Sequence, residues 1–191
     1  MKYQDDNHYI DRVLGGDAAA YALLVAKHKN LVFSIALKIL NNREDAEEVA
    51  QDCFMKVFQA LKTFERKSKF STWLYRIVYN AAISKTRKKK LEQVPMDSYV
   101  IDNYTEDNIA LGMDEIDAEE QKIMMEKALE RLTNDENLLI TLFYKGDNSI
   151  EEISNITGLS MSNVKVRLHR IRKKLHDELT MMMNKAVTHL N

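Results

Sequence analysis

The sequence predicts an all-α protein, because little in it interrupts helices. Pro occurs once and Gly five times in 191 residues. Strict alternation of apolar and polar residues, which is typical of half-buried strands, is scarce, whereas apolar residues often recur at helical spacing. These helical patterns fall into two groups separated by an acidic stretch. The sequence therefore predicts two small helical domains joined by a flexible acidic linker, the second with a helix-turn-helix.

The first domain is expected over residues 1–90. Its early helices are expected over residues 5–14, 18–40 and 45–61, the second of them as two helices or one bent helix broken near Lys29-Asn30. Asn42 is placed to cap the helix that follows it. The single cysteine, Cys53, leaves no internal disulfide, and its position on an apolar stripe predicts that it is buried and inert.

The domain is organised around a helix expected over residues 70–90, with Ser71 as its N-cap. Its apolar face is formed by Leu74, Ile77, Val78 and Ala81. The opposite face carries Arg76, Tyr79, Asn80 and Ile83, and it runs into a basic stretch at 85–90. Bases stack on aromatic rings and phosphates attract cations, so this face is a candidate nucleic-acid surface. A basic run alone is usually a solvated face, and Trp73 alone is expected to be core.

Residues 91–121 are expected to form the linker. They contain ten acidic residues, no Lys or Arg, and the only proline, Pro95. A structureless segment of this length inside a compact domain would be unusual, which favours an interdomain connection.

The second domain is expected over residues 122–191. Capping boxes are expected at Thr133 with Glu136 and at Ser149 with Glu152. A short helix that stops at Gly158 is followed by a long basic helix over about 161–183. This is the pattern of a helix-turn-helix, whose second helix would place residues 162–169 against base edges in the major groove. The alternative is a plain helical hairpin with a solvated basic face.

The sequence contains no sign of catalysis. Its five histidines are scattered, and no phosphate-binding glycine loop or metal-ligand cluster is present. We therefore expect no enzyme activity, no metal and no cofactor. The first residues contain no apolar signal core, and the longest apolar-rich stretch, Leu31–Leu40, is too short to span a bilayer. The sequence predicts a cytoplasmic protein without membrane insertion.

Three motifs in this order resemble the sigma factors of bacterial RNA polymerase, most closely the small two-domain extracytoplasmic-function (ECF) subgroup. They are DAEEVAQDCFMKVFQAL at 45–61, FSTWLYRIVYN at 70–80, and SIEEI at 149–153 followed by VKVRLHRIRKKL at 164–175. The resemblance implies that residues 1–90 form sigma region 2 and residues 122–191 form sigma region 4. It implies a transcription initiation factor that binds core RNA polymerase and promoter DNA and has no enzymatic activity of its own.

The resemblance also implies residue roles. Binding to the clamp helices of the polymerase's largest subunit is assigned to Asp45, Glu48, Gln51, Asp52, Met55 and Lys56. Binding to the minus-ten element, as a non-template strand with a flipped base, is assigned to Phe64, Arg66, Lys67, Lys69, Trp73, Tyr75, Arg76, Tyr79, Asn80, Ile83 and Arg87. Binding to the minus-thirty-five element is assigned to Ser162, Asn163, Lys165, Val166, Arg167, His169 and Arg170.

Further partners implied by the resemblance are the flap of the second-largest polymerase subunit and an anti-sigma factor that covers the polymerase-binding surface. The linker would lie in basic polymerase channels. Housekeeping members carry a Trp pair where this chain has Arg76 and Ile77, so weaker duplex melting and stricter promoter choice are expected. Two alternatives stay open: a stand-alone helix-turn-helix regulator that binds duplex tightly by itself, and an enzyme acting on nucleic acid.

Overall fold

The structure, a computed structural model, describes residues 5–90 and 117–188. Every element within these ranges is a helix, which confirms the predicted all-α class. The first group comprises α1 (Asp6–Leu14), α2 (Ala18–Leu40), α3 (Arg43–Ala60), the 3-10 turn η1 (Leu61–Thr63) and α4 (Phe70–Lys90). The second comprises α5 (Ala118–Glu130), α6 (Asn134–Ile140), the π-helix η2 (Thr141–Lys145), α7 (Ile150–Thr157) and α8 (Met161–Thr188).

In the first group α2 packs against α1, α3 and α4. Asp17 caps α2 by accepting hydrogen bonds from the Ala19 and Ala20 N–H groups, and Asn42 caps α3 as expected. The break expected near Lys29-Asn30 is absent, and α2 is one continuous helix. Both residues are exposed and neither is Gly or Pro, so nothing forces the backbone to bend there.

The boundaries of α4 differ slightly from the expectation. The helix begins at Phe70, so Ser71 lies inside its first turn rather than at its N-cap. Its buried stripe runs through Leu74, Val78 and Ala82, while Ile77 is only half-buried. The buried stripe also includes Tyr75, which packs inside the domain with 4% of its surface exposed.

The second group shows the expected helix signals. Both capping boxes form, and Gly158 ends α7 with φ 77°, a left-handed conformation that glycine adopts without strain. Helix α5 begins at Ala118, four residues before the expected domain start, because the Asp117 side chain caps it. Helix α8 extends to Thr188, beyond the expected end near 183. The rest of the predicted linker lies outside the described residues.

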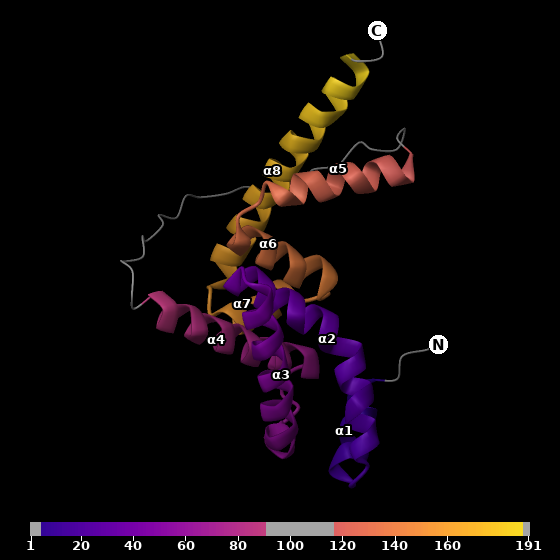
Figure 1. Cartoon of the computed structure of the whole chain (residues 1–191), viewed down its shortest axis with the longest axis vertical. Coiled ribbons are helices and arrows are strands. Elements are labelled where there is room, and N and C mark those ends of the chain that lie inside the picture. The colour runs from indigo at the N-terminus through magenta and orange to yellow at the C-terminus, as the bar shows by residue number, and fades with distance from the viewer. Residues whose placement is uncertain (1–4, 91–116, 189–191) are drawn as a thin grey trace.

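The two groups pack directly on one another (Figure 1). Helix α7 lies against α4, and α6 lies against α2. Their buried residues belong to one hydrophobic cluster that runs from Ile10 to Leu179. Helix α5 lies against α8 in one part of the molecule, and α1 lies at the opposite end (Figure 1). None of the helices in the described ranges is long and apolar enough to cross a membrane.

Candidate nucleic-acid and polymerase interface

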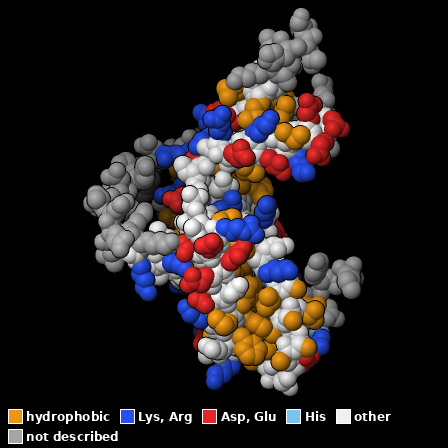
Figure 2. Space-filling model, viewed as in Figure 1, with side chains coloured by type: hydrophobic (Ala, Val, Ile, Leu, Met, Phe, Trp, Pro, Cys, Tyr) orange, Lys and Arg blue, Asp and Glu red, His pale blue; other side chains and the backbone are white. Residues whose placement is uncertain are grey.

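One face of α3 carries the residues assigned to polymerase binding. Glu48, Gln51, Met55 and Lys56 are exposed, whereas Asp52 is half-buried. Met55 exposes 59% of its surface and Phe58, one turn further along the helix, exposes 47%. Figure 2 shows hydrophobic side chains gathered over the end of the molecule formed by α1, α2 and α3. Large exposed apolar side chains beside charged ones are typical of a protein-binding surface.

Asp45, which was assigned to the same surface, has a partner within the chain. Lys85 of α4 lies 3.1 Å from the Asp45 carboxylate and 2.7 Å from that of Glu48. The hydrogen bond to Glu48, followed by that to Asp45, raises the pKa of Lys85. Part of the basic run on α4 is therefore bound to α3 and ties the two helices together.

A groove of about 590 Å³ lies between α3 and α4. Its α3 side is lined by Glu48, Asp52 and Lys56, which belong to the assigned polymerase surface. Its α4 side includes Asn80, which is exposed and belongs to the assigned minus-ten set. The two assigned surfaces are thus neighbours across a single groove.

The loop before α4 holds an aromatic cluster. The Phe64 ring lies 5.1 Å from that of Trp73 and 5.8 Å from that of Phe70, measured between ring centroids. Phe64 and Trp73 are half-buried, so each packs in the cluster and stays partly accessible. Arg66 has a positive φ of 57° and forms an ion pair with Asp11 of α1. These contacts fix the loop against the first domain.

The exposed side of α4 carries most of the remaining minus-ten set. Arg76, Asn80 and Arg87 are exposed, and Tyr79 and Ile83 are half-buried. In the loop before it, Lys67 is exposed and pairs with Glu65. Aromatic, amide and basic groups therefore follow one another along this side, as the sequence predicts.

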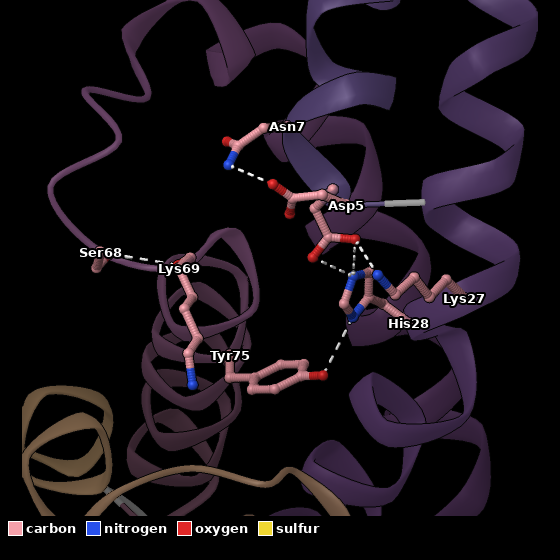
Figure 3. A network of polar contacts seen from close by, with 8 residues as sticks. Asp5, Asn7, Lys27, His28, Ser68, Lys69 and Tyr75 are labelled. Atoms are coloured by element: carbon pink, nitrogen blue, oxygen red, sulfur yellow. Dashed lines mark hydrogen bonds and ion pairs between the residues drawn. The ribbon is translucent and has the colours of Figure 1, made fainter. Parts of the chain in front are cut away.

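Tyr75 is placed differently. Its hydroxyl lies 3.1 Å from Nδ1 of His28, which is 5% exposed (Figure 3). Nε2 of the same ring lies 3.2 Å from the Asp6 carboxylate. A carboxylate can only accept, so Nε2 donates to Asp6 and, in the neutral ring, Nδ1 accepts from Tyr75. Burial alone would raise the pKa of Asp6, but its hydrogen bonds to His28 and Lys27 lower it. Tyr75 thus links α4 to α2 and α1 inside the domain rather than facing solvent.

The helix-turn-helix has the expected core. Ile153 and Ile156 of α7 and Val164 and Leu168 of α8 are each at most 2% exposed. Ser160 accepts a hydrogen bond from the Asn163 N–H and so supports the start of α8. Of the assigned minus-thirty-five set, the exposed residues are Ser162, Lys165 and Arg170, and the half-buried ones are Asn163, Val166, Arg167 and His169. Arg167 Nε donates to Asn163 Oδ1 at 2.9 Å, which orients both side chains.

The start of α4 contacts the second domain, and the charges of two residues of that domain act on Tyr79. Burial raises the pKa of the Tyr79 hydroxyl, and the charge of Asp135 raises it further while that of Arg167 lowers it. Thr72 and Lys69, at the start of α4, both contact Glu152 of α7. The sequence contained no local signal for these contacts, because they join residues about 80 positions apart.

The remaining chemistry of the described residues is limited. Within 5–90 and 117–188, no group of three or more His, Cys, Asp or Glu side chains is placed to hold a metal ion. Cys53 is fully buried, and this burial raises the pKa of its thiol to about 11. A thiol of this kind stays protonated at neutral pH and is a poor nucleophile.

Two family models match the chain: sigma-70 region 2 over residues 24–92 and sigma-70 region 4 over residues 122–175. The chain is 30% identical over 182 residues to the ECF RNA polymerase sigma factor SigW of Bacillus subtilis, covering 89% of this chain and 94% of that protein. It is 25% identical over 197 residues to the RNA polymerase sigma-H factor of Pseudomonas aeruginosa, covering 97% and 100%.

Solved structures share the fold. CnrH in complex with the cytosolic domain of CnrY matches with a TM-score of 0.60 and 22% identity, over 93% of this chain and 99% of that one. RpoE in complex with the anti-sigma factor NepR, from Bartonella quintana, matches with a TM-score of 0.59 and 24% identity, over 84% and 96%. The region 2 match, the region 4 match and the similarity to SigW together show that the chain belongs to the ECF group of the sigma-70 family of RNA polymerase sigma factors.

Proposed function

We propose that this sigma factor binds core RNA polymerase through the exposed face of α3, directs it to specific promoters and helps to open the duplex locally. The observation that carries the proposal is the adjacency of two different faces across the groove between α3 and α4. The α3 face is acidic and apolar, which suits a protein partner. The α4 face is aromatic, amide-bearing and basic, which suits a nucleic-acid strand.

The second domain supplies a separate contact to duplex DNA. The first turns of α8 present Ser162, Lys165 and Arg170 at the surface, with Arg167 and Asn163 oriented by their mutual hydrogen bond. Arg and Asn make paired hydrogen bonds to base edges in the major groove. We assign the minus-thirty-five element to this surface and the minus-ten element to α4, with the polymerase performing the chemistry.

Two protein partners complete the proposal. The flap of the second-largest polymerase subunit contacts the second domain. An anti-sigma factor covers the α3 face and so prevents polymerase binding. The RpoE protein of Bartonella quintana was solved with the anti-sigma factor NepR, which supports a regulator of this kind. The exposed Met55 and Phe58 side chains supply apolar area for either partner on α3.

The test is co-elution with purified bacterial core RNA polymerase in size-exclusion chromatography. The variant Asp52→Lys reverses a charge on the proposed docking face and should abolish co-elution. Glu47→Lys makes the same charge change on the same helix, about 140° around it at 3.6 residues per turn, and should co-elute like the unmodified chain. Failure of the unmodified chain to co-elute would refute the polymerase-binding function and favour a stand-alone regulator. Equal co-elution of all three proteins would show that the docking surface lies elsewhere on the chain.

A further inference from the structure

We propose that α1 holds the loop at 64–69 in the shape in which it receives the minus-ten strand, and that Arg66 acts as a positioning residue tied to Asp11 rather than as a DNA contact. The inference rests on the proposed function, because the shape of this loop matters only if the loop and α4 take a DNA strand. The loop joins η1 to the start of α4. Helix α1 contacts η1 and α2 and carries none of the residues assigned to polymerase or DNA.

The two ends of the loop are packed, whereas its middle is not. The rings of Phe64 and Phe70 lie 5.8 Å apart between centroids, and Phe70 is 3% exposed. All residues at 65–69 are exposed. Hydrophobic packing therefore fixes where the loop begins and ends, and polar contacts have to fix the path between.

The ion pairs of the loop differ in what they reach. Lys67 pairs with Glu65 inside the loop, and Lys69 pairs with the second domain. Arg66 pairs with Asp11 of α1. Of the ion pairs in the described ranges, that of Arg66 is thus the one that ties the exposed middle of the loop to the rest of the first domain.

The backbone of Arg66 indicates a constraint at the same place. Its φ of 57° lies in the left-handed region, which Gly, Asn and Asp adopt more readily than Arg. A residue stays in such a conformation only where its surroundings hold it, and residues of this kind cluster at functional sites. Arg66 Nη2 donates to Asp11 Oδ1, so the side chain supplies a contact that holds the backbone there.

Helix α1 is itself anchored in the core, which makes Asp11 a fixed point. Ile10 is fully buried. Asp6 accepts from Lys27 Nζ at 2.6 Å and from His28 Nε2 at 3.2 Å. His28 in turn lies against the Tyr75 hydroxyl near the start of α4 (Figure 3). One short helix therefore connects to the loop through Asp11 and to α4 through His28.

The exposure of the pair sets the size of the expected effect. The side chains of Arg66 and Asp11 are 41% and 62% exposed, and an ion pair in that setting contributes little to the stability of the fold. Breaking the pair should therefore leave the domain folded and change only the path of the loop.

The first measurement uses Trp73, the only tryptophan of the chain, whose ring lies 5.1 Å from that of Phe64. Acrylamide is a neutral quencher, so the charges of the variants do not change its local concentration. In the free full-length chain, Asp11→Arg and Arg66→Asp should each raise the quenching of Trp73 fluorescence. The double variant exchanges the two charges and should return the quenching toward that of the unmodified chain. Circular dichroism melts check folding, and Asp11→Asn decides the question if Asp11→Arg does not fold.

The second measurement is promoter opening by the holoenzyme. The DNA is a promoter fragment selected from random-sequence DNA by core RNA polymerase carrying the unmodified chain, and permanganate reactivity of unpaired thymines gives the opening rate. Each single variant should slow opening by at most about fivefold, the range of an exposed ion pair, and the double variant should recover the rate. If Arg66 contacts DNA directly, Asp11→Arg will not slow opening, and the double variant will stay as slow as Arg66→Asp.

The matched control is Lys67→Asp, which makes the same charge change at the next residue of the loop. Lys67 pairs with Glu65 rather than with α1, so adding Asp11→Arg to Lys67→Asp should not restore opening. Restoration there, or a charge exchange at 11 and 66 that restores quenching without restoring opening, would overturn the proposal. Quenching that no variant at 11 or 66 alters would overturn it as well. A holoenzyme that selects and opens no DNA refutes the proposed function, while Trp73 quenching still decides whether α1 holds the loop.

Discussion

Replacing Tyr75 with Phe should weaken the fold of the first domain without removing a DNA contact. The change deletes only the hydroxyl that lies 3.1 Å from His28 Nδ1. The His28 ring is 5% exposed, so no bulk water is available to replace the lost partner. Leaving a buried acceptor without a hydrogen bond costs about 1–3 kcal/mol. For a chain of this size each kcal/mol lowers the melting temperature by roughly 2–4 °C.

The assay is urea unfolding followed by circular dichroism, with Tyr144→Phe as the control. Tyr144 is 60% exposed and its hydroxyl accepts from Arg172 Nε at 3.1 Å, so the same chemical change occurs at the surface. It should alter the free energy of unfolding by about 0.5 kcal/mol or less. Promoter opening, measured well below the melting temperature with polymerase present, should be unchanged in Tyr75→Phe. Unchanged stability combined with lost promoter opening would refute this reasoning and return Tyr75 to the minus-ten surface.

Three other predictions concern separate parts of the chain. Gly146→Ala should destabilise the second domain by about 1–3 kcal/mol in urea unfolding, because its Cβ would lie 2.2 Å from Asn148 Nδ2 and 2.5 Å from the Leu142 carbonyl oxygen. Arg167→Ala should weaken closed-complex binding to duplex promoter by about 1–3 kcal/mol, whereas Asn80→Ala should impair opening; equal effects on closed-complex binding would contradict this division. The pKa of Glu136 is lowered, since the hydrogen bonds from Lys174 and Thr133 outweigh the opposing effect of burial. Its stabilisation is therefore complete above its ordinary pKa of 4.5 and is lost as pH falls through the lowered value, so acid titration of unfolding should be shallower in Glu136→Gln.

The parts of the fold that sequence predicts are those determined by near neighbours. The capping boxes at Thr133 and Ser149 each involve residues three apart, and both form. The Gly158 turn follows from backbone sterics alone, and the stripe from Val164 to Leu175 follows from helical periodicity. Signals of this kind need no knowledge of which helix packs on which.

The parts that sequence does not predict depend on distant partners. Tyr75 was assigned to the minus-ten surface by the resemblance alone, and the sequence around it does not reveal its contact with His28, 47 positions earlier. The residues near Asp45 in the sequence do not reveal its ion pair, because the partner, Lys85, lies on another helix. The π-helix at 141–145 is also unexpected, because apolar spacing does not distinguish it from a continuing α-helix. For the candidate binding residues, the sequence therefore indicates which side chains suit DNA or a protein partner. It does not indicate which of them are already bound by another residue of the chain.

The length of α8 couples two ends of the second domain. Its 28 residues form a rod about 42 Å long at 1.5 Å per residue. The first turns carry the proposed base-reading side chains, and α5 packs against the same helix further along it (Figure 1). A rod without a hinge transmits rotation along its whole length. A partner that turned α8 at its contact with α5 would therefore turn the first turns of the helix as well, so the orientation of the proposed base-reading side chains depends on the whole length of α8.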